Sequence, residues 1–321
     1  MTKRIGFIGL GLMGHGMASN LMAKGHSLTL LGTRSRANVA DLVGRGARAV
    51  DTPAEVAAAS EIVFTCVGSS ADVEGLVYGE TGILAGAKPG LIHVDTTTAN
   101  PVSTARIAAD YAARGLRFAD APLGRTPKEA AEGRLNVMLG ADAALRDELM
   151  PVLKGFAENV FHVGPVGAGH TMKLINNFMA MSHATVVAEA VAAARAAGLD
   201  LKVMFDIISA GGANSGMFQM VMPWVIDGDA SRLKFSIANA RKDIAYYNAF
   251  ASEKRLTGAV RPRRPVRAAP HRPDERTRGR GQRRPRNILI QPSICACRNR
   301  VNDLSTESRS MNLSFGVFVR Y

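Results

Sequence analysis

The first half of the chain alternates between short apolar runs and Ala-rich stretches with helical periodicity. The apolar runs at residues 5–8, 28–31 and 62–67 are nearly continuous, which is typical of parallel strands covered on both faces. Further strands are predicted at residues 47–50, 91–95, 116–120, 135–139 and 161–163. Strands that alternate with helices in this way predict an α/β domain with a mainly parallel sheet.

The pattern changes after residue 169, where every predicted element is a helix. One long helix is expected from residue 170 to 198, and shorter helices at residues 201–209, 217–225 and 237–253. Such a long helix fits a spine between domains or a helix buried in a subunit interface. We therefore expect a first domain at residues 1–164 and an all-helical domain at residues 165–257, with the boundary in a glycine-rich loop.

A glycine-rich turn follows the first predicted strand and precedes the first predicted helix. It reads Gly9-Leu10-Gly11-Leu12-Met13-Gly14, the G-x-G-x-x-G spacing of dinucleotide-binding turns. Gly9 permits the tight turn, Gly11 lets a pyrophosphate approach the backbone, and Gly14 lets the helix pack close to the strand. The helix N-terminus then presents free N–H groups to the phosphates. This order predicts a Rossmann domain, with Leu12 and Met13 beside the cofactor.

The end of the second predicted strand carries the residues expected to read the adenosine ribose. An acidic residue there favours NAD, because it binds the ribose 2′-hydroxyl and repels a 2′-phosphate. This chain instead has Arg34, Ser35 and Arg36, and a guanidinium matches a phosphate well. We therefore expect NADP, with NAD as the alternative. Solvated loop arginines are the simpler interpretation of the same pattern.

Two more strand ends are expected to face the cofactor. Val67 closes one strand, and Thr96, Thr97 and Thr98 follow another. Thr98 is assigned to the cofactor site, because a hydroxyl at this position could bind the nicotinamide or the substrate. The alternative role of these threonines is to cap the helix that begins near Pro101.

The long helix opens with Lys173, Asn176 and Asn177. On a helix these are positions i, i+3 and i+4, so the three side chains project from one face. A single lysine on a helix is most often a solvated surface residue. The pattern alone therefore does not identify a catalytic group.

The net charge of +13 is concentrated at the C-terminal end. Residues 259–321 hold 15 Arg, no Lys and 4 acidic residues, so the rest of the chain is nearly neutral. Arg and Pro at this density cannot form a packed core, and we expect residues 258–321 to be a disordered basic tail. A nucleic-acid-binding arm is a disfavoured alternative, because Arg without a single Lys is unusual for such an arm.

Several other classes of protein are disfavoured. No apolar run reaches the roughly 18 residues of a membrane span, and no signal peptide is evident, so a cytoplasmic protein is expected. Three cysteines argue against a disulfide scaffold. Cys295 and Cys297 have no further ligands nearby, and no metal site is predicted.

Four segments carry a resemblance to a known family. They are residues 9–14 with Asn20 and Leu21, residues 95–98 with Pro101, residues 173–177, and Lys242 with Asp243. In this order and spacing, the chain up to about residue 257 resembles the β-hydroxyacid dehydrogenases, which include 3-hydroxyisobutyrate dehydrogenase and tartronate semialdehyde reductase. The resemblance implies a Rossmann domain, an all-helical second domain, NAD(P) and a homo-oligomer.

The resemblance also implies roles for residues. The family's catalytic lysine falls on Lys173, and its second lysine, near the cofactor, falls on Lys242. Asn177 is expected to hold the lysine amine or the substrate hydroxyl, and Asn176 the polar end of the substrate. The implied reaction is reversible hydride transfer between the nicotinamide and a short 3-hydroxy acid or its semialdehyde, with Lys173 exchanging the proton.

The substrate loop departs from the usual family pattern. Most members have Ser-Gly-Gly there, whose serine and amides hold a carboxylate, whereas this chain has Gly124, Arg125 and Thr126. That version is similar to the loop of 3-sulfolactaldehyde reductase, which grips a sulfonate. A guanidinium suits a tetrahedral oxyanion, so we expect Arg125 to bind an anionic substrate. Alternatively, Arg125 faces solvent or pairs with an acid such as Glu129.

The resemblance stops near residue 258, where the family would continue with two more helices that close the active site. Our hypothesis is that the Arg-rich tail is a frameshift product of a GC-rich gene. A one-base slip near codon 258, found by resequencing the gene, would support it, and an intact frame would contradict it. An inactive cofactor-binding protein with a damaged C-terminus is the alternative to an active enzyme.

Overall fold

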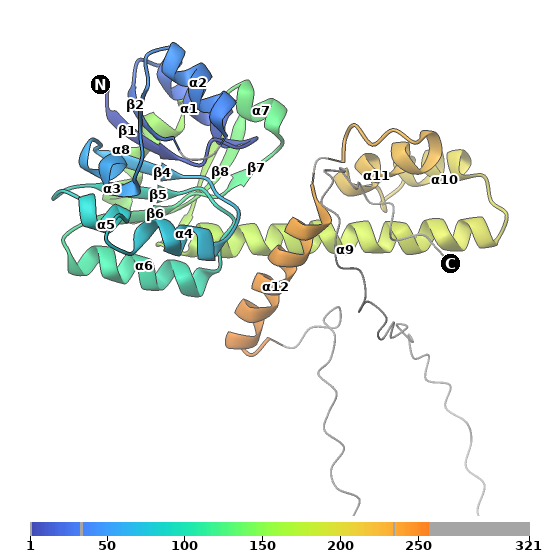
Figure 1. Ribbon diagram of the computed structural model, residues 1–321. Helices are drawn as coiled ribbons and strands as arrows, with labels where there is room; N and C mark the ends of the chain where they lie inside the picture. Colours follow the sequence, from blue (N-terminus) through green and yellow to red (C-terminus); the bar gives the residue numbers. More distant parts are fainter. Residues whose placement is uncertain (1, 33–34, 234, 257–321) are drawn as a thin grey trace, which may run out of the picture. The chain divides into compact units, whose positions relative to one another are not determined.

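The computed structural model describes residues 2–32, 35–233 and 235–256. Within these residues it contains nine strands and twelve helices (Figure 1). The strands are β1 (Arg4–Ile8), β2 (Ser27–Leu31), β3 (Arg48–Val50), β4 (Ile62–Thr65), β5 (Ile92–Asp95), β6 (Arg117–Asp120), β7 (Leu123–Gly124), β8 (Leu135–Gly140) and β9 (Ala157–Gly164). The helices are α1 (Gly14–Ala23), α2 (Arg36–Gly44), α3 (Pro53–Ala58), α4 (Ser70–Val77), α5 (Ile83–Gly86), α6 (Pro101–Ala113), α7 (Pro127–Ala131), α8 (Ala143–Leu153), α9 (Ala168–Ala196), α10 (Leu201–Ala210), α11 (Gly216–Asp227) and α12 (Ile237–Glu253).

The strands form one sheet in the order β3-β2-β1-β4-β5-β6-β8-β7, and β9 pairs with β8. The strands from β1 to β6 pair in parallel, with Ile5 opposite both Leu28 of β2 and Ile62 of β4. β8 runs antiparallel to β6 and β7. The strand order reverses at β1 and β4, and open α/β sheets bind ligands at the carboxyl ends of the strands at such a point.

Helices cover both faces of the central strands. Ile62 and Phe64 of β4 belong to a core with α1, α2 and α8, whereas Val63 belongs to a second core with α3, α4 and α6. All four residues of β4 are buried, which explains its continuous apolar sequence. The apolar run of β4 therefore predicted this strand, because the strand has no solvent-facing side.

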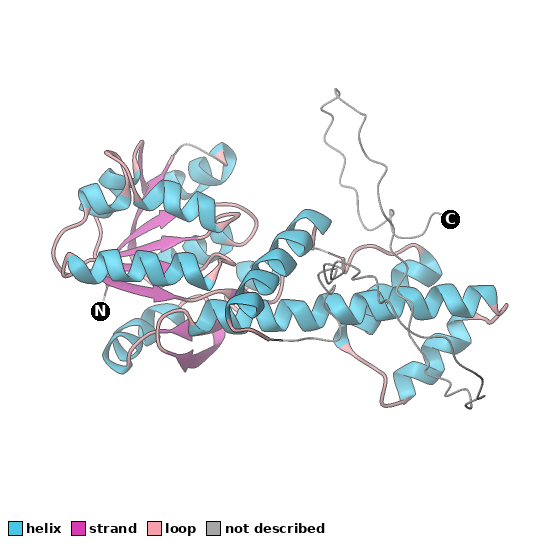
Figure 2. Cartoon of the chain, turned by 90° about the horizontal axis from the view of Figure 1, so that it is seen from below, coloured by secondary structure: helices cyan, strands magenta, loops and turns pink. Residues whose placement is uncertain are grey.

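The described chain after β9 is entirely helical, and Figure 2 shows strands only in the part that precedes α9. α9 is 29 residues long and contacts β8, β9 and α6 as well as α10, α11 and α12. Val187 and Val191 of α9 form a small core with Phe218, Val221 and Met222 of α11. The predicted class, a Rossmann-type α/β domain followed by an all-helical domain, is confirmed. None of the described helices is both long and apolar enough to cross a membrane.

Some short elements differ from the prediction. β9 begins at Ala157, four residues before the predicted strand, and β7, α5 and α7 were not predicted. β7 has two residues and exists through its pairing with β8. The basic tail, including Cys295 and Cys297, lies outside the described residues, so the disorder, nucleic-acid and frameshift hypotheses stay predictions.

Candidate active site

The glycine turn lies between β1 and α1, at the carboxyl edge of the sheet. Gly9 has a φ of 102°, and a Cβ there would lie 2.2 Å from the carbonyl oxygen of Cys66, just after β4. A Cβ on Gly14 would lie 2.0 Å from the carbonyl oxygen of Gly9. A Cβ on Gly11, in contrast, would meet no described atom within 4 Å. Packing therefore requires the first and third glycines, whereas Gly11 leaves an open approach to the backbone that fits a phosphate.

The rest of the turn is also open to a ligand. The side chain of Leu12 is 81% exposed, and Met13 precedes the first residue of α1. Met13 makes no side-chain cap, and the first turn of α1 holds no acidic residue. The N-terminal amides of α1 are therefore suited to an anion such as a pyrophosphate.

The residues expected to bind the adenosine ribose of the cofactor lie at the start of α2. Ser35 precedes this helix with a φ of 52°, and Arg36 is exposed. Asn38 donates a hydrogen bond from Nδ2 to the carbonyl oxygen of Leu10 at 2.7 Å, which ties α2 to the glycine turn. Arg34 lies outside the described residues, so the choice of NADP over NAD stays a prediction.

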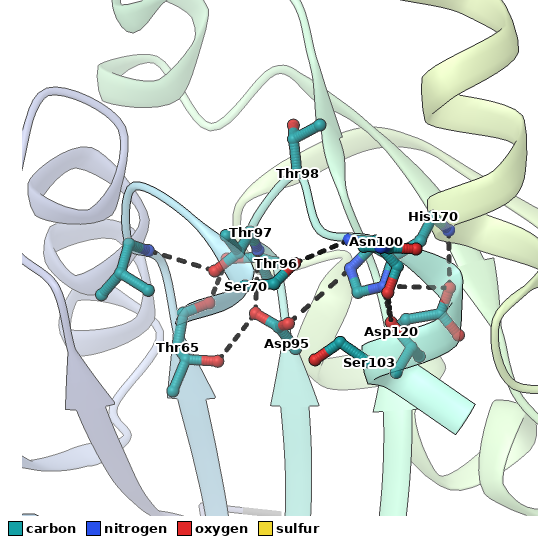
Figure 3. Close-up of polar contacts among 12 residues, drawn as sticks. Thr65, Ser70, Asp95, Thr96, Thr97, Thr98, Asn100, Ser103, Asp120 and His170 are labelled. Atoms are coloured by element: carbon teal, nitrogen blue, oxygen red, sulfur yellow. Dashed lines mark hydrogen bonds and ion pairs between the residues drawn. The ribbon is translucent and has the colours of Figure 1, made fainter. Parts of the chain in front are cut away.

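The loops after β4 and β5 are bonded to each other through threonines (Figure 3). The Val67 amide donates to Oγ1 of Thr97 at 3.2 Å, and the Thr96 hydroxyl donates to the carbonyl oxygen of Thr65 at 2.7 Å. Thr98, drawn apart from this network in Figure 3, has a side chain without a hydrogen-bond partner in the described part of the chain. Of the three threonines, Thr98 therefore has the hydroxyl that best fits a cofactor or substrate.

The alternative role of these threonines, as the cap of the next helix, is wrong. Asn100 caps α6, because its side chain accepts a hydrogen bond from the Val102 amide. Asn and Asp accept such bonds at least as well as Thr, and Asn100 directly precedes Pro101. The predicted Val67 and Thr98 lie on the two loops beside the glycine turn.

Lys173 lies in the second turn of α9 and is half-buried. Burial lowers the pKa of Lys173 from 10.5 to about 8. Two charges on α12 act in opposite directions, because Asp243 raises this pKa and Lys242 lowers it. An amine with a pKa near 8 is suited to exchanging a proton at neutral pH.

The two asparagines beside Lys173 differ in their surroundings. Asn177 is buried and donates from Nδ2 to Oδ2 of Asp243 at 2.7 Å. Asn176 is exposed and donates to Oδ1 of Asn177 at 3.2 Å. Sequence reasoning gave Asp243 no role, although it is 2% exposed and links α12 to the lysine helix. Its position directly after Lys242 was the available signal.

Lys242 connects α12 to the loops at the edge of the sheet. Its Nζ donates to the carbonyl oxygens of Gly68 at 2.8 Å and Thr98 at 3.1 Å, and it lies 3.1 Å from Oδ1 of Asp243. Tyr246, one turn later, accepts a hydrogen bond from the Ser70 amide at 3.2 Å. Lys242 of α12 therefore contacts both loops expected to face the cofactor, and its place near the cofactor stays a prediction.

The substrate loop is bonded to its own chain. Arg125 has a φ of 76°, and its guanidinium contacts the Glu158 carboxylate on β9. Thr126 caps α7, with its amide and hydroxyl bonded to Glu129. Of the predicted alternatives, pairing of Arg125 with a neighbouring acid is therefore present, but the acid is Glu158, because Glu129 completes the capping box.

The helix that follows this loop rests on the helix that follows the glycine turn. Asn20 of α1 donates from Nδ2 to the carbonyl oxygens of Ala130 at 3.0 Å and Ala131 at 3.2 Å. A Cβ on Gly16 of α1 would lie 2.6 Å from the backbone of Ala130. The close approach of α1 and α7 therefore depends on Gly16 and Asn20.

Sequence reasoning gave no role to three buried polar residues at the same edge. Asp95 and Asp120 end β5 and β6, and His170 lies in the first turn of α9 (Figure 3). Each is at most 1% exposed. Acidic residues at the last position of two neighbouring parallel strands were the signal, since such ends meet at one edge. Within the described residues, no group of three or more His, Cys, Asp or Glu side chains is placed to hold a metal ion.

Two family models match the chain in succession. The NAD binding domain of 6-phosphogluconate dehydrogenase matches residues 4–164. The model described as NAD-binding of NADP-dependent 3-hydroxyisobutyrate dehydrogenase matches residues 167–260. The matched segments include the glycine turn, Lys173 and Lys242.

Individual relatives agree with these models. The chain is 35% identical to 2-(hydroxymethyl)glutarate dehydrogenase of Eubacterium barkeri over 227 residues, which are 70% of this chain and 75% of the relative. It is 34% identical to 3-sulfolactaldehyde reductase of Escherichia coli K12 over 241 residues, 75% of this chain and 80% of the relative. The structure of Mycobacterium tuberculosis 3-hydroxyisobutyrate dehydrogenase with L-serine superposes with a TM-score of 0.73 at 25% identity, covering 81% of this chain and 90% of that one.

Proposed function

We propose that this chain interconverts a short anionic 3-hydroxy acid and its semialdehyde with NADP(H). The chain belongs to the β-hydroxyacid dehydrogenase family, which includes 3-hydroxyisobutyrate dehydrogenase, and the proposal follows from this membership. The observation that carries the proposal is Lys173, half-buried on α9, with its pKa lowered to about 8. Bound dinucleotide supplies or accepts the hydride. The open glycine turn, the first turn of α1, Thr98 and Lys242 fit the binding of that dinucleotide.

Lys173 performs the proton transfer in this proposal. During reduction, the protonated amine donates to the oxygen of the carbonyl carbon that receives hydride. During oxidation, the neutral amine accepts the hydroxyl proton of the substrate. Asn177, fixed by its bond to Asp243, holds the amine or the substrate hydroxyl, and Asn176 faces the polar end of the substrate.

Substitution of Lys173 tests this function. Lys173→Ala should abolish turnover while NADPH binding, measured by fluorescence titration, stays unchanged. Lys202→Ala removes an exposed lysine on α10 and serves as the control that should keep full activity. Full activity of Lys173→Ala would contradict the mechanism. If the wild-type protein binds NADPH but converts none of a panel of C3 and C4 semialdehydes, the alternative of an inactive cofactor-binding protein would be supported instead.

The cofactor preference rests on the start of α2. No acidic residue follows β2 directly, and Ser35 has the left-handed conformation that Asp also tolerates. Ser35→Asp should therefore lower kcat/KM for NADPH more than for NADH, because a carboxylate repels the 2′-phosphate. If the ratio of kcat/KM for NADPH to kcat/KM for NADH is the same in Ser35→Asp and in wild type, Ser35 does not lie beside a bound 2′-phosphate.

The substrate class rests on Arg125. Its pair with Glu158 is partly solvated, with side chains 28% and 48% exposed, and such pairs contribute only about 0–1 kcal/mol. An anionic substrate can therefore replace Glu158 at little cost, and a sulfonate offers the tetrahedral oxygens that a guanidinium binds well. Arg125 would then hold the acidic end of the substrate between Gly124 and Thr126.

Paired substitutions test this clasp. Arg125→Gly keeps a residue that accepts a positive φ, and it should raise KM for a sulfonate-bearing semialdehyde about 10-fold or more. KM for a neutral aldehyde should stay the same. Glu158→Gln frees the guanidinium and should lower KM for the anionic substrate or leave it unchanged. Equal losses on charged and neutral substrates in Arg125→Gly would reject the clasp.

A homo-oligomer is the expected assembly. Met172, Met179 and Val186 recur at seven-residue spacing on α9 and are 39%, 54% and 64% exposed. Val203 and Ile207 of α10 are also exposed. A stripe of this kind is typical of a subunit interface. Light scattering should give a multiple of the 34.1 kDa chain, and Val186→Glu should reduce it.

A further inference from the structure

The first turn of α9 is capped by a side chain from another element. Asp120 ends β6, and its Oδ1 accepts a hydrogen bond from the Gly167 amide at 2.6 Å. Its Oδ2 accepts one from the His170 amide, also at 2.6 Å. The first amides of a helix have no partner within the helix, and Gly167 makes no side-chain cap. The Asp120 carboxyl group accepts hydrogen bonds from two of these amides, and its burial raises the pKa of Asp120.

Two glycines allow the helix to approach this carboxylate. A Cβ on Gly140 of β8 would lie 2.3 Å from Oδ1 of Asp120. A Cβ on Gly169 of α9 would lie 2.2 Å from the carbonyl oxygen of Met138 and 2.8 Å from Oδ2 of Asp120. A side chain at either position would push α9 away from the sheet. The start of α9 therefore packs directly against Asp120 and the strand beside it.

His170 extends this attachment to a second strand end. The imidazole is fully buried, and its Nδ1 lies 2.7 Å from Oγ1 of Thr104 on α6. Its Nε2 lies 3.8 Å from Oδ2 of Asp95 and has no hydrogen-bond partner among the described residues (Figure 3). Oδ1 of Asp95 accepts hydrogen bonds from the Thr65 hydroxyl and the Thr97 amide. The same cluster therefore contacts α9 and the loops expected to face the cofactor.

Lys173 follows His170 by one helical turn. Because a helix moves as a rigid unit over one turn, any shift of the Asp120 attachment displaces the lysine amine as well. The bonds of Asp120 run to α9 rather than within the sheet, so their loss should move the helix more than the strands. A displacement of about 1 Å between reacting groups costs about 100-fold in rate.

We propose that Asp120 and His170 are positioning residues for Lys173: they fix the first turn of α9 against the ends of β5 and β6, and so hold the amine beside the reacting oxygen. This proposal rests on the proposed dehydrogenase function for its kinetic consequence. The attachment of the helix is a separate consequence that can be measured without turnover.

Asp120→Asn tests the attachment, because it keeps the shape but replaces one acceptor oxygen by a donor. We expect kcat to fall about 100-fold, while KM and the dissociation constant of NADPH change less than about 3-fold. Amide hydrogen exchange should rise about 10-fold in peptides covering residues 168–176 and stay unchanged in β4. Asp142→Ala removes an exposed helix cap at α8 and is the control, expected to lower Tm without changing kcat.

Two substitutions of His170 distinguish the roles of its two ring nitrogens, Nδ1 and Nε2. Asn can reproduce the contact of Nδ1 with Thr104, whereas Gln reaches the position of Nε2 near Asp95. His170→Asn should keep most of kcat, and His170→Gln should lose it in the manner of Asp120→Asn. Unchanged exchange at residues 168–176, or equal losses in kcat and cofactor affinity, would overturn the proposal. If Asp120→Asn increases amide exchange at residues 168–176 but the wild-type protein turns over no substrate, the attachment stays valid and the proposed function is refuted.

Discussion

The pH dependence of turnover follows from the surroundings of Lys173. Burial lowers the pKa of Lys173 from 10.5 to about 8, which favours the neutral amine by about 3 kcal/mol. At pH 7.5, about a quarter of the protein then carries the neutral amine, compared with about one in a thousand for an ordinary lysine. Both the acid and the base form are therefore available to the reaction.

The two directions of the reaction should show opposite pH profiles. In the oxidative direction, kcat/KM should rise with pH to a plateau above about 8, because the neutral amine is the base. In the reductive direction, kcat/KM should fall above about 8, because the ammonium is the acid. Initial rates at saturating cofactor between pH 5.5 and about 10 would measure both midpoints.

Neighbouring residues of α12 should move that midpoint in opposite directions. Asp243→Asn removes a charge that raises the pKa of Lys173, so the midpoint should fall by about one unit. The side-chain oxygen of the introduced asparagine can still accept the hydrogen bond from Asn177. Lys242→Met removes a charge that lowers the pKa, so the midpoint should rise by a similar amount. Asp206→Asn, on the exposed side of α10, is the control that should leave it unchanged. Midpoints that move together, or stay fixed, would refute this account of the lysine.

Three further outcomes are expected. Gly11→Ala should weaken NADPH binding about 10-fold or more without changing Tm, whereas Gly14→Ala should lower Tm, because only the second Cβ meets the backbone. Lys173→Met should raise the free energy of unfolding at pH 7 by about 1–3 kcal/mol. The unfolded lysine binds its proton more tightly than the folded one, so wild type recovers this stability between pH 8 and 10.5, as chemical denaturation would show. Asn20→Ala should lower Tm by a few degrees and raise substrate KM, because α7 loses its bonds to α1.

The elements that the sequence predicts well are those decided by local pattern. α12 was predicted with its exact bounds, and β1 and α9 to within two residues at their starts, because buried strands and amphipathic helices are visible in the order of apolar residues. β7 was missed because its two residues have no pattern of their own and depend on pairing with β8. Contacts between distant segments decide such elements.

The same distinction separates the predicted and the missed parts of the site. The glycine turn was assigned from spacing within one segment, whereas the roles of Lys173 and Asn177 came from the family resemblance. The bonds of Arg125 to Glu158, of Asn177 to Asp243 and of Asp120 to α9 join residues 33 to 66 positions apart, which local spacing does not reveal. The alternative partner suggested for Arg125, Glu129, was near in sequence but already used by the cap of α7.

The attachment of α7 to α1 limits how this active site can change during evolution. Asn20 and Gly16 hold α7 directly against the helix that begins at the dinucleotide turn, so mutations cannot shift α7 without disturbing both halves of the site. In the loop of residues 123–126 just before it, Arg125 and Thr126 bond to Glu158 and Glu129 rather than to α1. Changes of specificity are therefore expected to arise by exchanging these few loop residues on an unchanged frame.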